Sequence, residues 1–225
     1  MFNQHRYYKI TWKLILVKSQ KEREKMKLRD HHFRDYEKKF VEVSNSGNVL
    51  SKMGEEDVKE PFIGYMYVDN NRGVTLRLLG NTENEVHEKY LKEKISVAGY
   101  DLIEDFDIEI IQEEIPSLEI IRKHTDKHYG EAHIEKVRDR IEIDNLRSRA
   151  YPDDVEIVIP YKEGYVEKMW VRSYDYILKE NIYIFSLLKD SCYDESLKKG
   201  ELIACKYFKK NNAEALIFFG KVEAL

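Results

Sequence analysis

The last third of the chain, residues 150–225, limits the possible folds most, because short apolar segments follow one another there with few helix signals between them. The segments are rich in β-branched and aromatic residues, which favour strands. They are DVEIVI, KMWVRSYDYI, IYIFSLLK, ELIACKYFK and EALIFFGKVEA. We therefore expect a small, β-rich α+β domain at residues 150–225.

A second group of strands is expected in the first half of the chain. The sequence PFIGYMYVD-NNRG-VTLRLLG predicts a hairpin, because its central residues can adopt the positive φ that a tight turn needs. Strands are also expected at residues 7–18 and 100–115, and a helix that starts with capping-box spacing is expected at residues 82–98. We infer an N-terminal domain at residues 1–118, in which helices cover a mainly antiparallel sheet.

Residues 119–149 form a heavily charged segment, which we expect to be a helical connector with a break at Gly130. Pro116 interrupts the strand pattern just before this segment and marks the end of the N-terminal domain. Basic and acidic residues are interleaved along the connector. Because a phosphate-binding surface needs unopposed positive charge, charge pairing on a solvated helix explains the segment better than nucleic-acid binding does.

The composition sets limits on the function. Charged residues make up 36% of the 225 residues, yet the net charge is only −4, so the chain as a whole has no general attraction to nucleic acid or anionic membranes. The two cysteines, Cys192 and Cys205, lack CxxC spacing, which argues against a zinc site or a disulfide framework. The longest apolar run near the start, LILV, is too short for a signal peptide or a membrane span. We expect a cytoplasmic protein that has no membrane partner.

Three histidines raise the question of a metal site. His124 and His128 are one helical turn apart, but Thr125 stands where the HExxH motif has its glutamate, and Gly130 interrupts the helix before His133. We expect no bound metal there.

Asp153 and Asp154, in YPDD, are the best candidates for acid–base chemistry, because they are adjacent carboxylates. A Pro-Asp-Asp sequence before a strand is more often a turn whose side chains bond to the backbone. The chain has no GxSxG motif, and neither cysteine has the cationic neighbours that activate a thiol. We assign no catalytic residue and no cofactor, and we keep both aspartates as candidate binding residues.

The stretch VEKMWVRSYDY, residues 166–176, places a tryptophan among charged residues. If Met169 and Val171 face the core of a strand, Trp170 lies on the opposite face. Two interpretations are open: the indole is buried under another part of the chain, or it is exposed for recognition. We favour burial. The candidate binding residues of this stretch are Glu167, Trp170, Arg172 and Tyr174.

Three elements of the last third carry a resemblance: YPDDVEIVIP, the Glu-x-Met-Trp-Val sequence that starts at Glu167, and KKGELI around Gly200. In these elements, residues 150–225 resemble the bacterial domain of unknown function 2314 and a related type of immunity protein. The chain departs from that pattern at IFSLLKDS, which lacks the family's Gly, Asn and Pro. The resemblance implies a small α+β module encoded beside toxins or mobile elements, and it transfers no catalytic residues. The first half of the chain resembles no family that we recognise.

Three functions fit these observations. The leading hypothesis is a non-enzymatic protein that binds another protein, such as a toxin or effector that it neutralises; the 16 tyrosines suit an interface. The alternative is an enzyme or small-ligand-binding protein with a site in a cleft between the two halves, built from Asp153, Asp154, Glu167 or Arg172. A second alternative is a nucleic-acid-associated protein that uses the basic residues of the connector.

Overall fold

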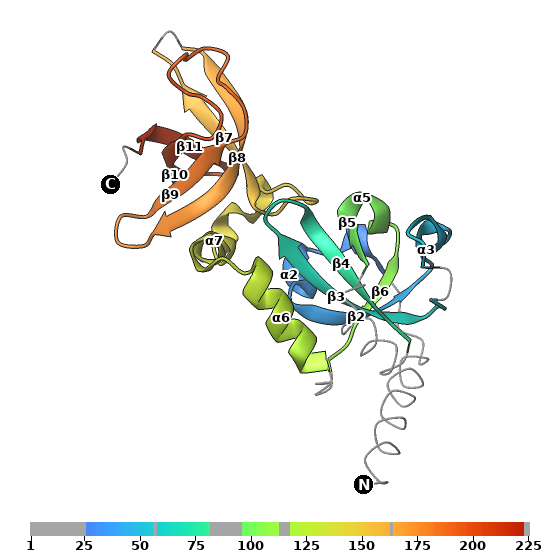
Figure 1. Cartoon of the computed structure of the whole chain (residues 1–225). Helices are drawn as coiled ribbons and strands as arrows, with labels where there is room; N and C mark the ends of the chain where they lie inside the picture. Colours follow the sequence, from blue (N-terminus) through green and yellow to red (C-terminus); the bar gives the residue numbers. More distant parts are fainter. Residues whose placement is uncertain (1–25, 56–57, 82–95, 113–117, 163, 223–225) are drawn as a thin grey trace. The chain divides into compact units, whose positions relative to one another are not determined.

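The computed structural model describes residues 26–55, 58–81, 96–112, 118–162 and 164–222. The chain divides into two compact units, residues 1–129 and 130–225. The structure is 23% helical and 43% strand, with mainly antiparallel sheets, which confirms the predicted α+β class (Figure 1).

The first unit contains a six-stranded sheet of order β1-β6-β2-β3-β4-β5, and each pair of neighbouring strands in it is antiparallel. The strands are β1 (Met26–Lys27), β2 (Lys39–Ser44), β3 (Phe62–Asp69), β4 (Gly73–Gly80), β5 (Val97–Gly99) and β6 (Asp107–Ile110). The short helices of this unit are η1 (Leu28–Asp30), α2 (Phe33–Tyr36), α3 (Val49–Lys52) and α5 (Tyr100–Ile103).

The hairpin β3–β4 confirms the prediction made for residues 61–80. Its turn is held by the carboxylate of Asp69, whose Oδ1 accepts hydrogen bonds from the backbone N–H groups of Asn71 and Arg72 at 2.8 and 3.0 Å. Gly73, at the end of the turn, has φ of 72°, a backbone conformation that suits glycine. Every residue of β3 is buried, so this hairpin lies at the centre of the unit.

Two elements of the first half differ from the sequence prediction. The helix expected at residues 82–98 lies outside the described residues up to position 95, and its last part is strand β5, which pairs with β4. The strand expected at residues 100–115 starts as helix α5 and becomes extended only at β6. At β5, pairing with β4 in the sheet overrides the local helix propensity. The strand expected at residues 7–18 lies outside the described residues.

Helix α6 (Glu119–Tyr129) covers one face of this sheet (Figure 1). Two hydrogen bonds join it to the strands: Tyr65 Oη donates to Asp126 Oδ1 at 2.7 Å, and Arg77 Nη1 donates to Thr125 Oγ1 at 2.6 Å. The apolar side chains buried together at this contact are Ile63, Tyr65, Tyr67, Leu79, Leu118 and Ile121. The apolar side of α6 therefore belongs to the core of the first unit.

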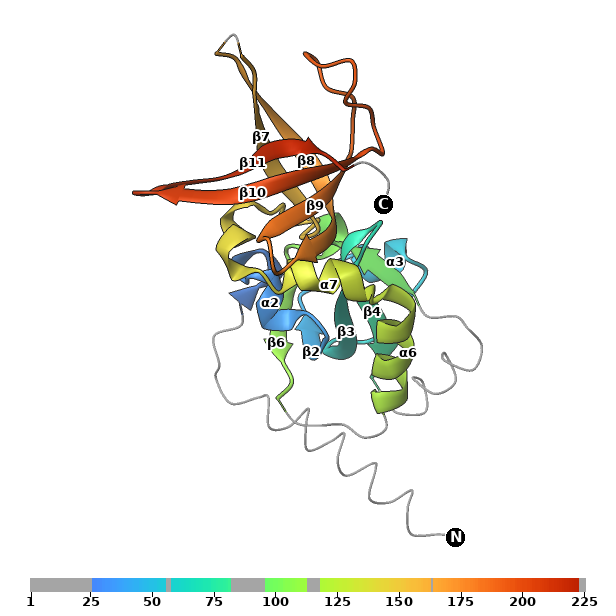
Figure 2. The ribbon, with the colours of Figure 1, turned by 90° about the vertical axis from the view of Figure 1, so that its left-hand side faces the viewer.

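The second unit is a closed five-stranded barrel (Figure 2). Its strands are β7 (Asp154–Pro160), β8 (Val166–Ile177), β9 (Ile182–Leu187), β10 (Leu202–Lys210) and β11 (Ala213–Lys221), which confirms the five predicted strand segments. Consecutive strands pair antiparallel, and β11 closes the barrel by parallel pairing with β7. Parallel closure follows from the odd number of strands, because the first and last strands of such a meander run in the same direction.

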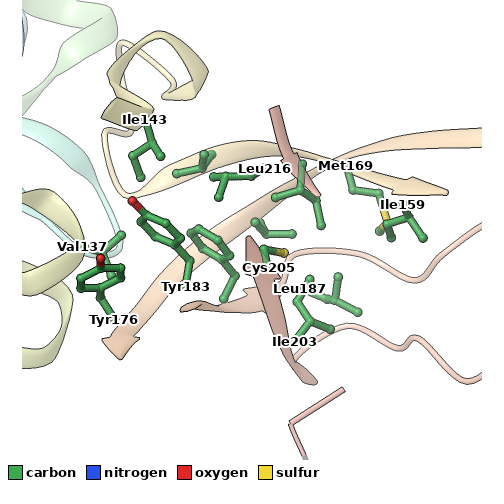
Figure 3. Close-up of a cluster of buried hydrophobic side chains, with 14 of the residues drawn as sticks. Val137, Ile143, Ile159, Met169, Tyr176, Tyr183, Leu187, Ile203, Cys205 and Leu216 are labelled. Atoms are coloured by element: carbon green, nitrogen blue, oxygen red, sulfur yellow. The ribbon is translucent and has the colours of Figure 1, made fainter. Parts of the chain in front are cut away.

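The barrel core is built from alternate residues of its strands (Figure 3). Ile157 is paired with both Met169 and Leu216, and all three side chains are buried. Along each strand, the residues next to these buried ones point outward, as the two-residue period of a strand requires. Irregular pairing at Ser173 and at Ala204 interrupts two of the ladders, and β-bulges of this kind help a sheet to bend.

Helix α7 (Ala132–Arg138) and the 3-10 helix η3 (Ile141–Leu146) pack at one end of the barrel, where Val137 and Ile143 join its core (Figure 3). The charged segment at residues 119–149 is therefore not a separate connector. It breaks at Gly130 as predicted, but α6 packs in the first unit, and α7 and η3 pack in the second. No helix in the described ranges is both long enough and apolar enough to cross a membrane.

Candidate functional site

Strand β8 carries four of the six candidate binding residues and presents them on two faces. Met169 and Val171 are buried in the barrel, whereas Trp170 and Tyr174 point outward and are each 45% exposed. The predicted burial of Trp170 is therefore wrong. The predicted alternation along β8 is correct, but in the structure the outward face of the strand at Trp170 is open to solvent.

Asp153 lies just before β7 and forms a buried ion pair with Arg138 of α7. Arg138 Nε donates to Oδ1 at 2.7 Å, and Arg138 Nη2 donates to Oδ2 at 2.6 Å. Both carboxylate oxygens are thus engaged in a bidentate pair, which is the strongest arrangement for these groups. This geometry makes Asp153 a structural residue.

Asp154 forms a second bidentate pair, with Arg172 on the neighbouring strand. The two residues are directly opposite each other on β7 and β8, and Arg172 Nε donates to Asp154 Oδ1 at 2.7 Å and Nη2 to Oδ2 at 3.1 Å. The bond to Asp154 is the main cause that raises the pKa of Arg172 above its ordinary value. The adjacent aspartates therefore bind two different arginines and do not face each other as an acid–base pair.

Glu167 points inward and is buried at the other end of the barrel. Its Oε2 accepts hydrogen bonds from Tyr161 Oη at 2.9 Å and from Ser191 Oγ at 2.6 Å, and its Oε1 accepts one from the backbone N–H of Cys192 at 3.0 Å. Burial raises the pKa of Glu167, but the hydrogen bonds from Ser191, Cys192 and Tyr161 outweigh it, so the pKa lies below its ordinary value. The carboxylate is ionised at neutral pH and fastens the loop after β9 to the barrel.

The candidate residues therefore do not form one site. Asp154 is paired with Arg172, but Glu167 lies opposite Ile159, five residues further along β7. At the rise of an extended strand this separates the two carboxylates by roughly 17 Å. The structure brings together no pair of candidate carboxylates that could share a proton.

The outward side of the barrel carries a group of apolar side chains that we name the Trp170 face. Strand pairing orders them into rows. One row runs through Ile217 and Val158, which are partners across the parallel β11–β7 contact. Phe208 of β10 is paired with Ala215 of β11, and Trp170 of β8 is paired with Glu156 of β7. The Trp170 face consists of outward side chains from four strands, β7, β8, β10 and β11: Val158, Trp170, Phe208, Ile217 and Phe219.

Three members of the Trp170 face are large and open to solvent. Trp170, Phe208 and Phe219 are 45%, 53% and 65% exposed. Isolated exposed apolar residues are ordinary, but several exposed aromatic side chains on the outer side of one small barrel are typical of a binding surface. These exposures place the aromatic residues where a partner could cover them.

Lysines border the Trp170 face. Lys206 lies over the ring of Phe219, with Nζ 4.4 Å from the ring centroid. Lys168 pairs with Glu156 at 2.6 Å, and Lys209 pairs with Glu214 at 3.5 Å. Within the described ranges Lys206 and Lys210 form no ion pair, so the border of the face has an excess of positive charge.

Sequence reasoning found Trp170 but missed the aromatic residues of β10 and β11. The signal was present in the lysines: Phe208 shares its strand face with Lys206, and Phe219 shares its face with Lys221. A lysine two residues away from a phenylalanine indicates that both side chains lie on the outward face of the strand. The closure of β11 onto β7, which brings Phe219 and Ile217 next to β7, cannot be read from alternation within single strands.

The histidine cluster is divided by the break after α6. The rings of His124 and His128 lie 4.3 Å apart on α6, whereas His133 is in the second unit, where its ring is 5.4 Å from that of Tyr174. Across the described ranges, no group of three or more His, Cys, Asp or Glu side chains is arranged to hold a metal ion. Both cysteines are free thiols, Cys192 exposed and Cys205 buried.

The basic residues of the predicted connector are largely engaged within their own units. In α6, Glu119 pairs with Arg122 at 2.6 Å and with Lys123 at 3.9 Å. In the second unit, Lys136 pairs with Asp175 at 2.9 Å, and Arg147 Nη1 and Nη2 donate to the backbone carbonyls of Pro152 and Val137. These contacts leave little unopposed positive charge along the segment.

Comparison with known proteins places the chain in no established group. No family model, no curated protein and no solved structure matches it. The resemblance of residues 150–225 to the domain of unknown function 2314 stays a prediction.

Proposed function

We propose that this protein is a non-enzymatic binding module that recognises another protein through the Trp170 face. The observation that carries the proposal is that Trp170 on β8, Phe208 on β10 and Phe219 on β11 are all exposed on the outer side of one closed barrel. Aromatic residues of this kind are enriched in protein interfaces, where a few large side chains provide most of the binding free energy.

The chemistry of the candidate carboxylates supports the same choice. Asp153 and Asp154 are both engaged by arginines, and Glu167 is engaged by three hydrogen-bond donors. A general acid or base must be able to reach a substrate proton. These carboxylates serve the barrel itself, which favours binding over the enzymatic alternative.

The charge around the face indicates what kind of protein it binds. Lys206 and Lys210 carry positive charge that no acidic side chain in the described part of the chain neutralises through an ion pair. A complementary partner has an apolar patch bordered by carboxylates. Neutralisation of a toxin or effector, which the resemblance of residues 150–225 implies, is the specific version of this proposal.

Affinity capture from the native host, with variants of the face as comparison, tests the proposal. Trp170→Glu and Phe219→Glu should each abolish capture of a protein that the parent retains. Leu178→Glu is the matched control, since Leu178 is 73% exposed but lies in the turn after β8. Equal capture by the parent and both face variants would show that the partner binds elsewhere.

A further inference from the structure

Three tyrosine rings gather at the barrel end that contains Glu167. Tyr161 and Tyr165 belong to the turn between β7 and β8, and Tyr193 belongs to the loop between β9 and β10. The ring centroid of Tyr193 lies 5.6 Å from that of Tyr161, with the planes inclined at 59°. It lies 6.3 Å from that of Tyr165, with the planes inclined at only 1°. Two segments far apart in sequence thus contribute rings in two orientations.

Hydrogen bonds fix this arrangement. Tyr161 Oη donates to the carboxylate of Glu167 at 2.9 Å. Ser191 Oγ accepts from the backbone N–H of Tyr193 at 3.1 Å and donates to the same carboxylate at 2.6 Å. The backbone N–H of Tyr161 also donates to the carbonyl of Tyr165 at 2.9 Å. The ring of Tyr161 and the backbone at Tyr165 and Tyr193 are therefore positioned before any ligand arrives, which lowers the entropy cost of binding.

Two of the three rings are open to solvent, and a carboxylate is bonded to the third. Tyr165 and Tyr193 are 62% and 65% exposed. The ionised carboxylate of Glu167 accepts the hydrogen bond that Tyr161 Oη donates. Among the described residues, lysine and arginine side chains lie over the rings of Phe33, Tyr176 and Phe219, but none lies over these three tyrosines.

We propose that Tyr161, Tyr165 and Tyr193 form an aromatic binding site for a methylated ammonium group. The faces of aromatic rings attract cations, and a quaternary ammonium is favoured because it gives up little hydration when the rings enclose it. The buried charge of Glu167 adds a long-range attraction for the same ligand. A trimethylated lysine side chain and a choline group share this chemistry. The site does not depend on the protein-binding role of the Trp170 face.

Titration of the full chain with three small probes, followed by NMR, tests the proposal. The probes are choline, N-acetyl-trimethyl-lysine amide and 3,3-dimethylbutanol, which has the shape of choline without its charge. At least one cation should bind about tenfold more tightly than the neutral alcohol, as expected for a cation–π contribution. The cation that binds more tightly identifies the source of the ligand. Equal affinity for the alcohol and both cations, or no saturable binding of either cation, would overturn the proposal.

Variants locate the binding. Tyr193→Ala should weaken the affinity for the cation about tenfold, whereas Tyr193→Phe, which keeps the ring, should retain it. Tyr165→Ala is a second variant in case Tyr193→Ala fails to fold, and Tyr129→Ala, at an exposed tyrosine of the first unit, is the control. Cation affinity that is unchanged in both folded alanine variants of the site would show that the rings only pack against each other.

Discussion

Arg138 binds the carboxylate of Asp153 through two parallel hydrogen bonds, 2.7 and 2.6 Å long, and both side chains are buried. Arg138 is the last residue of α7, and Asp153 immediately precedes β7. The pair therefore fastens the helix to the start of the barrel. Because removal of either residue leaves the other buried without this ion pair, the loss of Arg138 or of Asp153 should be costly.

We expect Asp153→Ala and Arg138→Ala each to lower the free energy of unfolding by about 3–5 kcal/mol, measured by urea denaturation. Glu156→Ala, which breaks the exposed pair with Lys168, is the comparison and should cost about 1 kcal/mol or less. If Asp153→Ala costs no more than Glu156→Ala, the buried pair does not stabilise the barrel as described.

Adjacent residues of β8 provide a test of the two faces of the strand. Met169 is 1% exposed and Trp170 is 45% exposed. Met169→Ala should therefore lower the free energy of unfolding by about 2–5 kcal/mol, because it leaves a cavity in the core. Trp170→Ala should lower it by about 1 kcal/mol or less, because the larger side chain is half in solvent. A melting temperature that falls further for Trp170→Ala would mean that the indole is buried after all.

Glu167 should contribute a stability that depends on pH. Its pKa in the folded protein lies below the ordinary value of 4.5, because its hydrogen bonds outweigh the effect of burial. The contribution is therefore complete above pH 4.5 and is lost as the pH falls through the lower pKa of the folded state.

The measurement is the free energy of unfolding of the parent and of Glu167→Gln between about pH 6 and about pH 3. The stability difference between the two proteins should be largest at the upper end and shrink as the pH falls. A difference that is constant over this range would show that the ionisation of Glu167 is not linked to folding.

The sequence predicted the strands of the barrel because its segments are rich in β-branched and aromatic residues, and β8 also shows a two-residue period. Met169 and Val171 alternate with Trp170, and that local pattern is preserved in the structure. What alternation cannot give is the order of strands in space. The parallel contact between β11 and β7 depends on residues about sixty positions apart, Leu216 with Ile157, and it brings Ile217 beside Val158 on the outer side of the barrel.

The ion pairs explain why the candidate site was predicted less well than the strands. Asp153 and Asp154 are neighbours in sequence and therefore looked like one site, but their carboxylates bind Arg138 and Arg172, on two different elements. Only the packing of α7 against the barrel brings Arg138 to Asp153. Charged residues of the segment 119–149 were expected on a solvated helix. Arg138 and Arg147 are nevertheless buried, because Asp153 accepts hydrogen bonds from Arg138 and the carbonyl of Val137 accepts one from Arg147.

The division of that segment leads to a test with two fragments of the chain. Residues 130–225 contain the barrel together with α7 and η3, whereas residues 150–225, the domain expected from sequence, lack both. The shorter fragment loses Val137 and Ile143 from the barrel core and leaves Asp153 without Arg138. Each of these losses removes a few kcal/mol, a large share of the stability of a small domain.

We expect the fragment 130–225 to unfold cooperatively on heating and the fragment 150–225 to show no cooperative transition, both followed by circular dichroism. Equal melting temperatures would mean that α7 and η3 are accessories to a barrel that is stable without them.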